Sequence, residues 1–282
     1  EKLTQLTKLR LGGNRLTDVE GLEKLTQLKT LSLGSTGLTN VEGLEKLTQL
    51  EELDLSDNEL TEVPRGLEKL TQLKKLGLNL NKLTDVNGLE NLTQLEELRL
   101  SFNQLTDVIA LEKLAELKKL NLSFNKLTEV PKGLEKLTQL EELELAGNQM
   151  TDVKGLEKLT ELKKLNLVGN QLTDVKGLEK LTQLEWLNLG ANQLTDVKAL
   201  QKLTQLKELW VQENKLTSVS GLENLTQLTR LYLHDNQLTS VSGLENLIKL
   251  DTLWLDDNKL TEVPKGLEKL AQLTSLGLGE NQ

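Results

Sequence analysis

The chain has 282 residues, of which 37% are hydrophobic, 2% aromatic and 27% charged, and its formal net charge is −9. This negative charge argues against nonspecific binding to nucleic acid or acidic membranes, because both need clustered lysine and arginine. The absence of cysteine excludes disulfide bonds and cysteine-based zinc sites, and it favours a cytoplasmic location. The apolar runs are short, which excludes a membrane span in this sequence.

One motif, LxxLxLxxNxL, recurs from Leu6 to the last residues and forms thirteen strand motifs without a linker. The interval between motifs is nearly constant, and the three repeats that contain a proline are longer by a single residue. Thr36 replaces the motif's asparagine once. The asparagines are Asn14, Asn58, Asn81, Asn103, Asn125, Asn148, Asn170, Asn192, Asn214, Asn236, Asn258 and Asn281. A fixed period of this kind predicts a solenoid in which each repeat packs on its neighbours.

Within a repeat, apolar residues alternate over a short strand, as in Leu53-Asp54-Leu55. This alternation directs the leucines inward and the intervening residue to the open face of a sheet. The segment that follows, residues 16–25 in the first repeat, spaces its apolar residues by three. That spacing predicts a 3₁₀-like turn rather than an α-helix, so we expect an α/β solenoid.

These residues, with the segment LTDVxGLEKLTQL, resemble the leucine-rich repeat family, in particular the short 22-residue repeats of bacterial internalins and Roco-type GTPases. The resemblance covers the whole chain. It implies a horseshoe with a concave parallel β-sheet and a 3₁₀ or irregular convex side. It also implies that the asparagine side chains bond to backbone groups of neighbouring turns, so that Thr36 weakens this ladder locally. Family members usually bind proteins or peptides on the concave face.

The unbroken register predicts a single domain over residues 1–282, with both ends truncated or uncapped. Uncapped terminal strands expose unpaired backbone groups, so we expect that oligomers can form through the ends.

Charged pairs follow the first leucine of successive strands and alternate in sign. They are Glu51-Glu52, Lys74-Lys75, Glu96-Glu97, Lys118-Lys119, Glu141-Glu142 and Lys163-Lys164. Neighbouring parallel strands lie roughly 4.8 Å apart, so this pattern predicts a cross-strand ladder of opposite charges with a structural role.

The pattern changes in the later repeats, where aromatic residues appear. Trp186 interrupts the charge alternation, and Trp210, Tyr232 and Trp254 then occupy the position between the two strand leucines. Strand alternation directs all four side chains outward. Exposed tryptophan and tyrosine rimmed by charge are typical of protein-interface hot spots, so we predict partner contacts here. The other interpretation is that the rings stack across strands and shield the sheet.

Acidic residues border these aromatics. The residues before the turn asparagine in the last four repeats are Glu213, Asp235, Asp257 and Glu280, and Asp256 adjoins them. Like charges in register cost stability, which predicts a partner protein or peptide with a basic segment. Solvated carboxylates screened by salt are an equally good interpretation, and a divalent cation bound only by oxygens is a third. Arg230 lies nearby and completes the predicted charged rim.

His234 is the single histidine and should point to the same face as Tyr232. A catalytic base needs a nucleophile and an orienting carboxylate in a pocket, which a shallow sheet does not offer. No phosphate loop, zinc cluster or nucleophile elbow is present. We therefore predict a non-enzymatic chain without a cofactor, in which His234 contacts the partner.

Three apolar residues, Leu80, Phe102 and Phe124, precede the turn asparagine in adjacent repeats. Large aromatic side chains are usually buried, so we expect these to form a small internal stack inside the turns.

The preferred interpretation is a protein- or peptide-binding module that uses the aromatic, acid-rimmed face of the later repeats. The near-identity of the repeats favours an alternative, an engineered or consensus-like array without a cognate ligand. A carbohydrate-binding face, on which the rings stack against sugars, is a further alternative.

Overall fold

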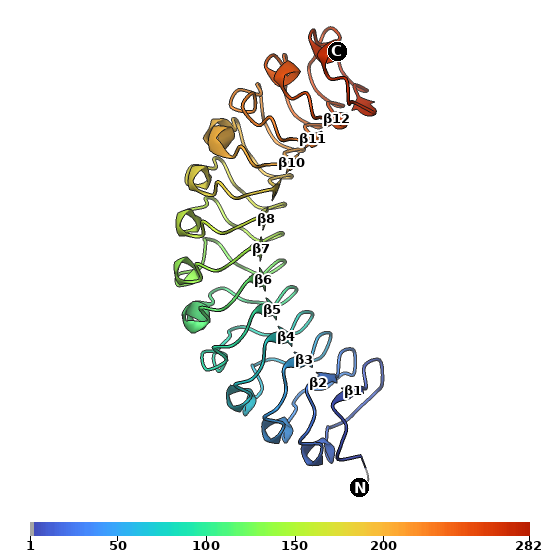
Figure 1. The fold of residues 1–282 in the computed structure, drawn as a ribbon, viewed down its shortest axis with the longest axis vertical. Coiled ribbons are helices and arrows are strands. Elements are labelled where there is room, and N and C mark those ends of the chain that lie inside the picture. The colour runs from blue at the N-terminus through green and yellow to red at the C-terminus, as the bar shows by residue number, and fades with distance from the viewer. Residues whose placement is uncertain (1–2) are drawn as a thin grey trace. The chain divides into compact units, whose positions relative to one another are not determined.

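The computed structural model describes residues 3–282, which form two compact units. The first unit comprises residues 3–127 and 131–140, and the second comprises residues 128–130 and 141–282. In each unit the strands lie along one side and the 3₁₀ helices along the other (Figure 1). The described residues contain all thirteen predicted strands, which confirms the solenoid fold. The single domain expected over residues 1–282 stays a prediction.

The strands of the first unit pair in parallel and in chain order. They are β1 (Lys8–Arg10), β2 (Thr30–Ser32), β3 (Glu52–Asp54), β4 (Lys75–Gly77), β5 (Glu97–Arg99) and β6 (Lys119–Asn121). The 3₁₀ helices of this unit are η1 (Leu22–Lys24), η2 (Leu44–Lys46), η3 (Leu67–Lys69), η4 (Ile109–Lys113) and η5 (Leu134–Lys136). They confirm the 3₁₀ turns predicted from the apolar spacing of three.

The second unit has the same organisation, with parallel strands that pair in chain order. Its strands are β7 (Glu142–Glu144), β8 (Lys164–Asn166), β9 (Trp186–Asn188), β10 (Glu208–Trp210), β11 (Arg230–Tyr232), β12 (Thr252–Trp254) and β13 (Ser275–Gly277). Its 3₁₀ helices are η6 (Leu156–Lys158), η7 (Leu178–Lys180), η8 (Lys198–Lys202), η9 (Leu244–Asn246) and η10 (Leu267–Lys269).

The core of each unit is a set of stacked leucine rows. The central residue of an inner strand is buried, as at Leu98 in β5 and Leu165 in β8, both 0% exposed. Burying one leucine side chain stabilises the fold by about 1.5–3 kcal/mol, and the repeat supplies such a residue at every turn. This arrangement leaves the residues on either side of the central leucine free to face outward.

The turn asparagines bond to backbone groups of the turns next to them, as predicted. Asn103 donates from Nδ2 to the carbonyl oxygens of Leu78 and Leu100, both at 3.0 Å, and its Oδ1 accepts from the Leu83 N–H at 2.9 Å. Thr36, which replaces asparagine in the second repeat, donates its hydroxyl to the Leu33 carbonyl oxygen at 2.8 Å. The threonine has one donor where the amide has two, so its turn carries fewer bonds.

The longer, proline-containing repeats keep the strand register. Glu52 of β3 pairs with Lys75 of β4 across one of these repeats, and Lys75 pairs with Glu97 of β5 across a repeat of ordinary length. The extra residue lies beside Pro64, on the side of the 3₁₀ helices, where the Pro64 carbonyl accepts from the Leu67 N–H at 3.2 Å. The insertion is therefore absorbed away from the sheet.

Candidate binding surface

The four predicted aromatic residues lie on the open face of the second unit, but they occupy two different rows. Trp210 pairs with Tyr232 and Tyr232 with Trp254, so these three side chains form one row across β10, β11 and β12. Trp186 pairs with Glu208, which places it in the row of the charge ladder.

The row of three continues into a compact cluster with His234. The ring centroids of Trp210 and Tyr232 are 3.7 Å apart with an interplanar angle of 20°, and Tyr232 meets Trp254 edge to face at 5.4 Å. The His234 ring lies 5.7 Å from that of Trp254. We call Trp210, Tyr232, His234 and Trp254 the aromatic cluster. In the described part of the chain, no ring contact joins Trp186 to it.

Exposure differs sharply within the aromatic cluster. Tyr232 is 9% exposed and fills the space between the two tryptophans, whereas Trp254 is 42% exposed. Burial raises the pKa of the Tyr232 phenol, and the nearby Glu208 carboxylate raises it further. The Trp254 ring is held through Nε1, which donates to the Ser275 hydroxyl at 3.3 Å. Trp254 therefore offers a fixed ring to solvent, and Tyr232 supports it from below.

Glu208 organises the charged side of the cluster. Its carboxylate accepts from Trp210 Nε1 at 2.6 Å and from an Arg230 guanidinium nitrogen at 3.1 Å. The Glu208 side chain is only 18% exposed. Arg230 is thus neutralised within the sheet, and the Trp210 indole is fixed in orientation.

The predicted acidic rim lies at a backbone position with left-handed geometry. Glu213, Asp235, Asp257 and Glu280 have φ values of 54°, 53°, 51° and 52°. Backbone hydrogen bonds join their turns, since Glu213 N–H donates to the His234 carbonyl and Asp235 N–H to the Asp256 carbonyl, both at 3.1 Å. The acidic residues therefore form a column along the edge of the sheet.

This left-handed position recurs in every described repeat, and we did not predict it from the sequence. Its remaining occupants are Gly13, Ser35, Asp57, Leu80, Phe102, Phe124, Gly147, Gly169 and Ala191. A residue other than glycine costs about 1–2 kcal/mol in this region. Glycine in three repeats was the sequence signal that could have revealed it.

A hollow of about 350 Å³ lies beside Trp254, at the end of the aromatic cluster. It is lined by His234, Trp254, Asp256, Asp257, Leu276 and Gly277. Asp256 accepts from the Gly279 N–H at 2.9 Å, and its carboxylate lies so close to Gly277 that a side chain there would collide with it. Asp256 is thus fixed by backbone contacts, while Asp257 is exposed on the rim.

Two polar atoms under this surface are buried without a hydrogen-bond partner among the described residues, Gln212 Oε1 and His234 Nδ1. Gln212 is 9% exposed and lies against Gly190 of the preceding repeat. Buried polar atoms nearly always have a hydrogen-bond partner, so the hydrogen-bonding capacity of these two atoms is left unused by the described residues.

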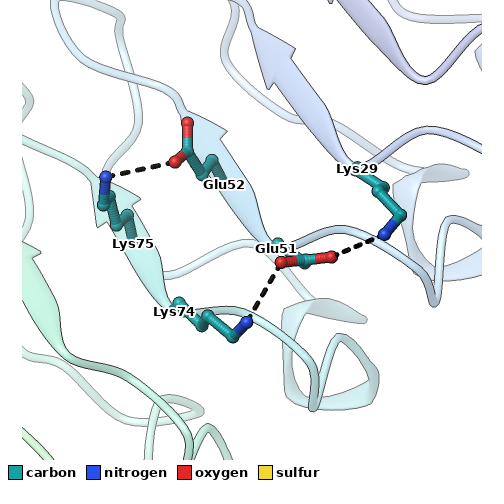
Figure 2. A network of polar contacts seen from close by, with 5 residues as sticks. All are labelled: Lys29, Glu51, Glu52, Lys74 and Lys75. Atoms are coloured by element: carbon teal, nitrogen blue, oxygen red, sulfur yellow. Dashed lines mark hydrogen bonds and ion pairs between the residues drawn. The ribbon is translucent and has the colours of Figure 1, made fainter.

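The charge ladder is confirmed on the open face of both units. Figure 2 shows Glu51 between Lys29 and Lys74, and Lys75 beside Glu52. The N–O distances from Glu51 to the two lysines are 3.0 and 3.1 Å, and that between Lys75 and Glu52 is 3.1 Å. Hydrogen bonds from the two flanking lysines lower the pKa of Glu51. One column of the ladder continues beyond the aromatic substitution, because Lys207 pairs with Glu185 at 2.7 Å. Trp186 therefore interrupts one of two columns.

The internal stack expected from Leu80, Phe102 and Phe124 is wrong. These side chains are 45%, 48% and 47% exposed, although the two phenylalanine rings stack with centroids 4.4 Å apart. Each residue lies in the left-handed region, with φ values of 56°, 56° and 55°, and this turn directs its side chain away from the interior. We call these three residues the apolar ridge.

Within residues 3–282, no three acidic or histidine side chains are placed to share a metal ion. No helix in this part of the chain has the length and apolar character needed to cross a membrane.

Comparisons with known proteins agree with the repeat architecture. A model described as a leucine-rich repeat region matches residues 2–129, and a model of two leucine-rich repeats matches residues 138–180, 182–224, 204–246 and 226–265. No curated protein matches the sequence.

Several solved structures are similar. An internalin, InlF, from Listeria monocytogenes is 31% identical with a TM-score of 0.88, covering 98% of this chain and 88% of that one. A leucine-rich repeat protein from Leptospira interrogans is 33% identical with a TM-score of 0.87, covering 99% and 80%. A plant peptide hormone receptor, RGFR1, in complex with RGF2, is 26% identical with a TM-score of 0.74, covering 96% and 50%. The repeat motif, the strand and turn geometry and these matches together show that the chain belongs to the leucine-rich repeat family.

Proposed function

We propose that this chain is a non-enzymatic binding module that takes a basic segment of a protein or peptide on the open face of its second unit. Leucine-rich repeat proteins are typically protein- or peptide-binding scaffolds, and the similar plant receptor was solved in complex with RGF2. The observation that carries the proposal is Trp254, a half-exposed ring that contacts the rings of Tyr232 and His234 beside a hollow bordered by Asp256 and Asp257.

The chemistry of the hollow suits a lysine or arginine side chain. A cation over a tryptophan face gains about 0.5–2 kcal/mol, more when water is excluded. The carboxylate of Asp257 is exposed at its rim, and the column of Glu213, Asp235 and Glu280 extends negative charge along the same edge. A basic segment would lie along this column and place one side chain in the hollow.

In this proposal, some of the other predicted contact residues touch the partner and the rest support the residues that do. Trp210 is fixed by Glu208 and presents part of its ring, Tyr232 supports the cluster, and Arg230 orients Glu208. His234 lines the hollow, and Trp186 would contact the partner one row away.

The test is selection of peptides from a random display library on the wild-type chain, followed by titration of the selected peptides by tryptophan fluorescence. We expect enrichment in lysine and arginine, and a loss of about 2 kcal/mol or more in binding for Trp254→Ala. Lys164→Ala, on the same face but in β8, is the matched control and should bind as the wild type does. Selection of no peptide, or equal affinity for Trp254→Ala, would overturn the proposal.

The structural alternative, a scaffold without a ligand, is favoured by one observation. Trp210 and Tyr232 stack closely and the Trp210 N–H is satisfied by Glu208, so part of the cluster stabilises the sheet itself. Under that alternative Trp254→Ala lowers the melting temperature and no library peptide binds. Binding of glycans rather than peptides on a glycan array would instead support a carbohydrate-binding face.

A further inference from the structure

We propose that the apolar ridge of Leu80, Phe102 and Phe124 is a second docking surface, whose occupant is an amphipathic α-helix with an apolar stripe bordered by carboxylates. The ridge lies in the first unit, and the proposal does not depend on the aromatic cluster.

The fold alone does not explain the ridge. Its residues have φ values of 56°, 56° and 55°, a region in which glycine is free of strain and bulky side chains are not. Elsewhere this position holds glycine, alanine or a polar residue. Three consecutive repeats accept the strain and expose large apolar side chains to water, which is typical of a surface that a partner covers.

The spacing of the ridge matches the stripe of a helix. The Leu80 N–H donates to the Ser101 carbonyl and the Phe102 N–H to the Ser123 carbonyl, both at 2.9 Å, so the three turns are stacked directly. The ring centroids of Phe102 and Phe124 are 4.4 Å apart. An α-helix repeats its apolar stripe about every 5.4 Å, so residues at i, i+4 and i+7 can meet all three ridge residues.

The size of the ridge favours a peptide helix over a second copy of the chain. Each half-exposed phenylalanine offers roughly half of the 150–250 Å² that an aromatic side chain can bury. These two phenylalanines and the half-exposed Leu80 together fall well short of the roughly 800 Å² per partner of a stable protein interface. The ridge is therefore sized for a few side chains of one helix.

One charge beside the ridge, that of Lys126, favours a helix with an acidic border. Lys82 and Lys126 each lie shortly after a ridge residue in the sequence, and both are exposed. Lys82 pairs with Glu59, whereas Lys126 donates to the neutral amide oxygen of Gln104 at 3.0 Å. Lys126 forms no salt bridge within the described residues, so a carboxylate of the docked helix would pair with it without breaking one.

The probe is a fluorescein-labelled alanine-rich helical peptide of about four turns, with leucines at i, i+4 and i+7 and glutamates beside them. Its binding to the full chain is followed by anisotropy. The test variant is Phe102→Gly with Phe124→Gly, which removes the rings at positions where glycine is unstrained, so the melting temperature should stay within a few degrees of wild type. Ala191→Gly makes the same kind of exchange at the same repeat position in the second unit and is the matched control.

We expect the double glycine variant to lose at least about tenfold in affinity, Ala191→Gly to bind like wild type, and Lys126→Glu to bind more weakly. A wild-type chain that does not bind the peptide, or an unchanged affinity in the folded double variant, would overturn the docking surface. Equal binding of a peptide with lysines in place of the glutamates would overturn the acidic occupant.

Discussion

The left-handed turn position determines which residue types each repeat accepts there without backbone strain. Gly169 has φ of 67°, and a Cβ added there would make only ordinary contacts, the nearest at 3.7 Å. Gly169→Ala should therefore destabilise the chain through backbone strain alone, by about 1 kcal/mol. Urea denaturation followed by circular dichroism measures this. Ala191→Gly, the opposite exchange at the equivalent position, relieves the same strain and should raise the midpoint, and a gain of stability in Gly169→Ala would contradict the argument.

The asparagine ladder makes a second prediction at the residue scale. Asn103 is 8% exposed, and Asn103→Ala would leave the Leu83 N–H without its partner. It would also remove one of two amide donors from the Leu78 and Leu100 carbonyl oxygens, which keep those of Asn81 at 3.1 Å and Asn125 at 3.0 Å. An unsatisfied buried N–H costs about 1–3 kcal/mol and each further lost bond about 0.5–1.5 kcal/mol, so we expect a loss of about 2 kcal/mol or more in the free energy of unfolding. Asn103→Thr, which copies the natural Thr36, should cost less. Equal losses in the two variants would show that the threonine hydroxyl contributes nothing.

Whether the position and contacts of a residue could be predicted depends on whether they are set by sequence spacing, by a backbone angle or by a side-chain rotamer. The leucine rows and the pairing of Glu52 with Lys75 follow from periodicity, because inward direction and register are set by sequence spacing. The asparagine bonds were expected only from the resemblance to the leucine-rich repeat family. The exposure of Phe102 depends on the sign of φ in one turn, which the sequence signals only through glycine in other repeats. The bond of Glu208 to Trp210 depends on rotamers, which no spacing rule fixes.

Between neighbouring strands, the opposite charges of the ladder favour the observed strand register. Lys75→Glu would place three carboxylates in a row, at Glu52, residue 75 and Glu97. We expect a lower urea midpoint at low salt and a smaller difference at high salt, because exposed charges are screened. The double exchange Glu52→Lys with Lys75→Glu restores an ion pair between residues 52 and 75 with the two charges swapped. It should therefore recover part of the lost stability. A deficit that is insensitive to salt would argue against an electrostatic cause.

The 3₁₀ helices carry a glutamate that bonds to the backbone at their start. In η6 the Gly155 N–H donates to Glu157 Oε2 at 2.7 Å, and the same arrangement recurs at Glu45, Glu179 and Glu245. It also occurs at Glu90, in a turn outside the 3₁₀ helices. Hydrogen bonds from the backbone N–H of Glu157 itself and then of Gly155 lower the pKa of this carboxyl. We did not predict this bond from the sequence.

A lowered carboxyl pKa implies a defined pH dependence. The glutamate bonds contribute stability above the unfolded pKa of about 4.3, and this contribution is lost as the pH falls through the lower folded value. Glu157→Gln keeps an acceptor but no longer titrates. We therefore expect the wild type to be more stable than Glu157→Gln at pH 7, with the difference in urea midpoint shrinking as the pH falls below the unfolded value of about 4.3. A difference that persists at low pH would contradict this assignment.

At the scale of the molecule, packing is local along the chain. Each strand in the described residues contacts only the strands before and after it, so stability is a sum over neighbouring repeats. Leu165→Ala in β8, at a fully buried site, should cost about 2–5 kcal/mol, whereas Leu276→Ala in β13, at a site 43% exposed, should cost less. Hydrogen exchange should accelerate first in β7 and β9 for Leu165→Ala. Equal acceleration through to β13 would show longer-range cooperativity than this packing allows.

The residue absorbed beside Pro64 has a consequence for engineering and for divergence. The register of β3 with β4 survives a change of repeat length, as does that of β12 with β13 across the longer repeat containing Pro264. We therefore expect a residue inserted on the far side of another repeat to leave the residues displayed on the sheet in place. The chain separates the side that tolerates changes of length from the side that displays the residues proposed to recognise a partner, so each can be altered while the other is kept.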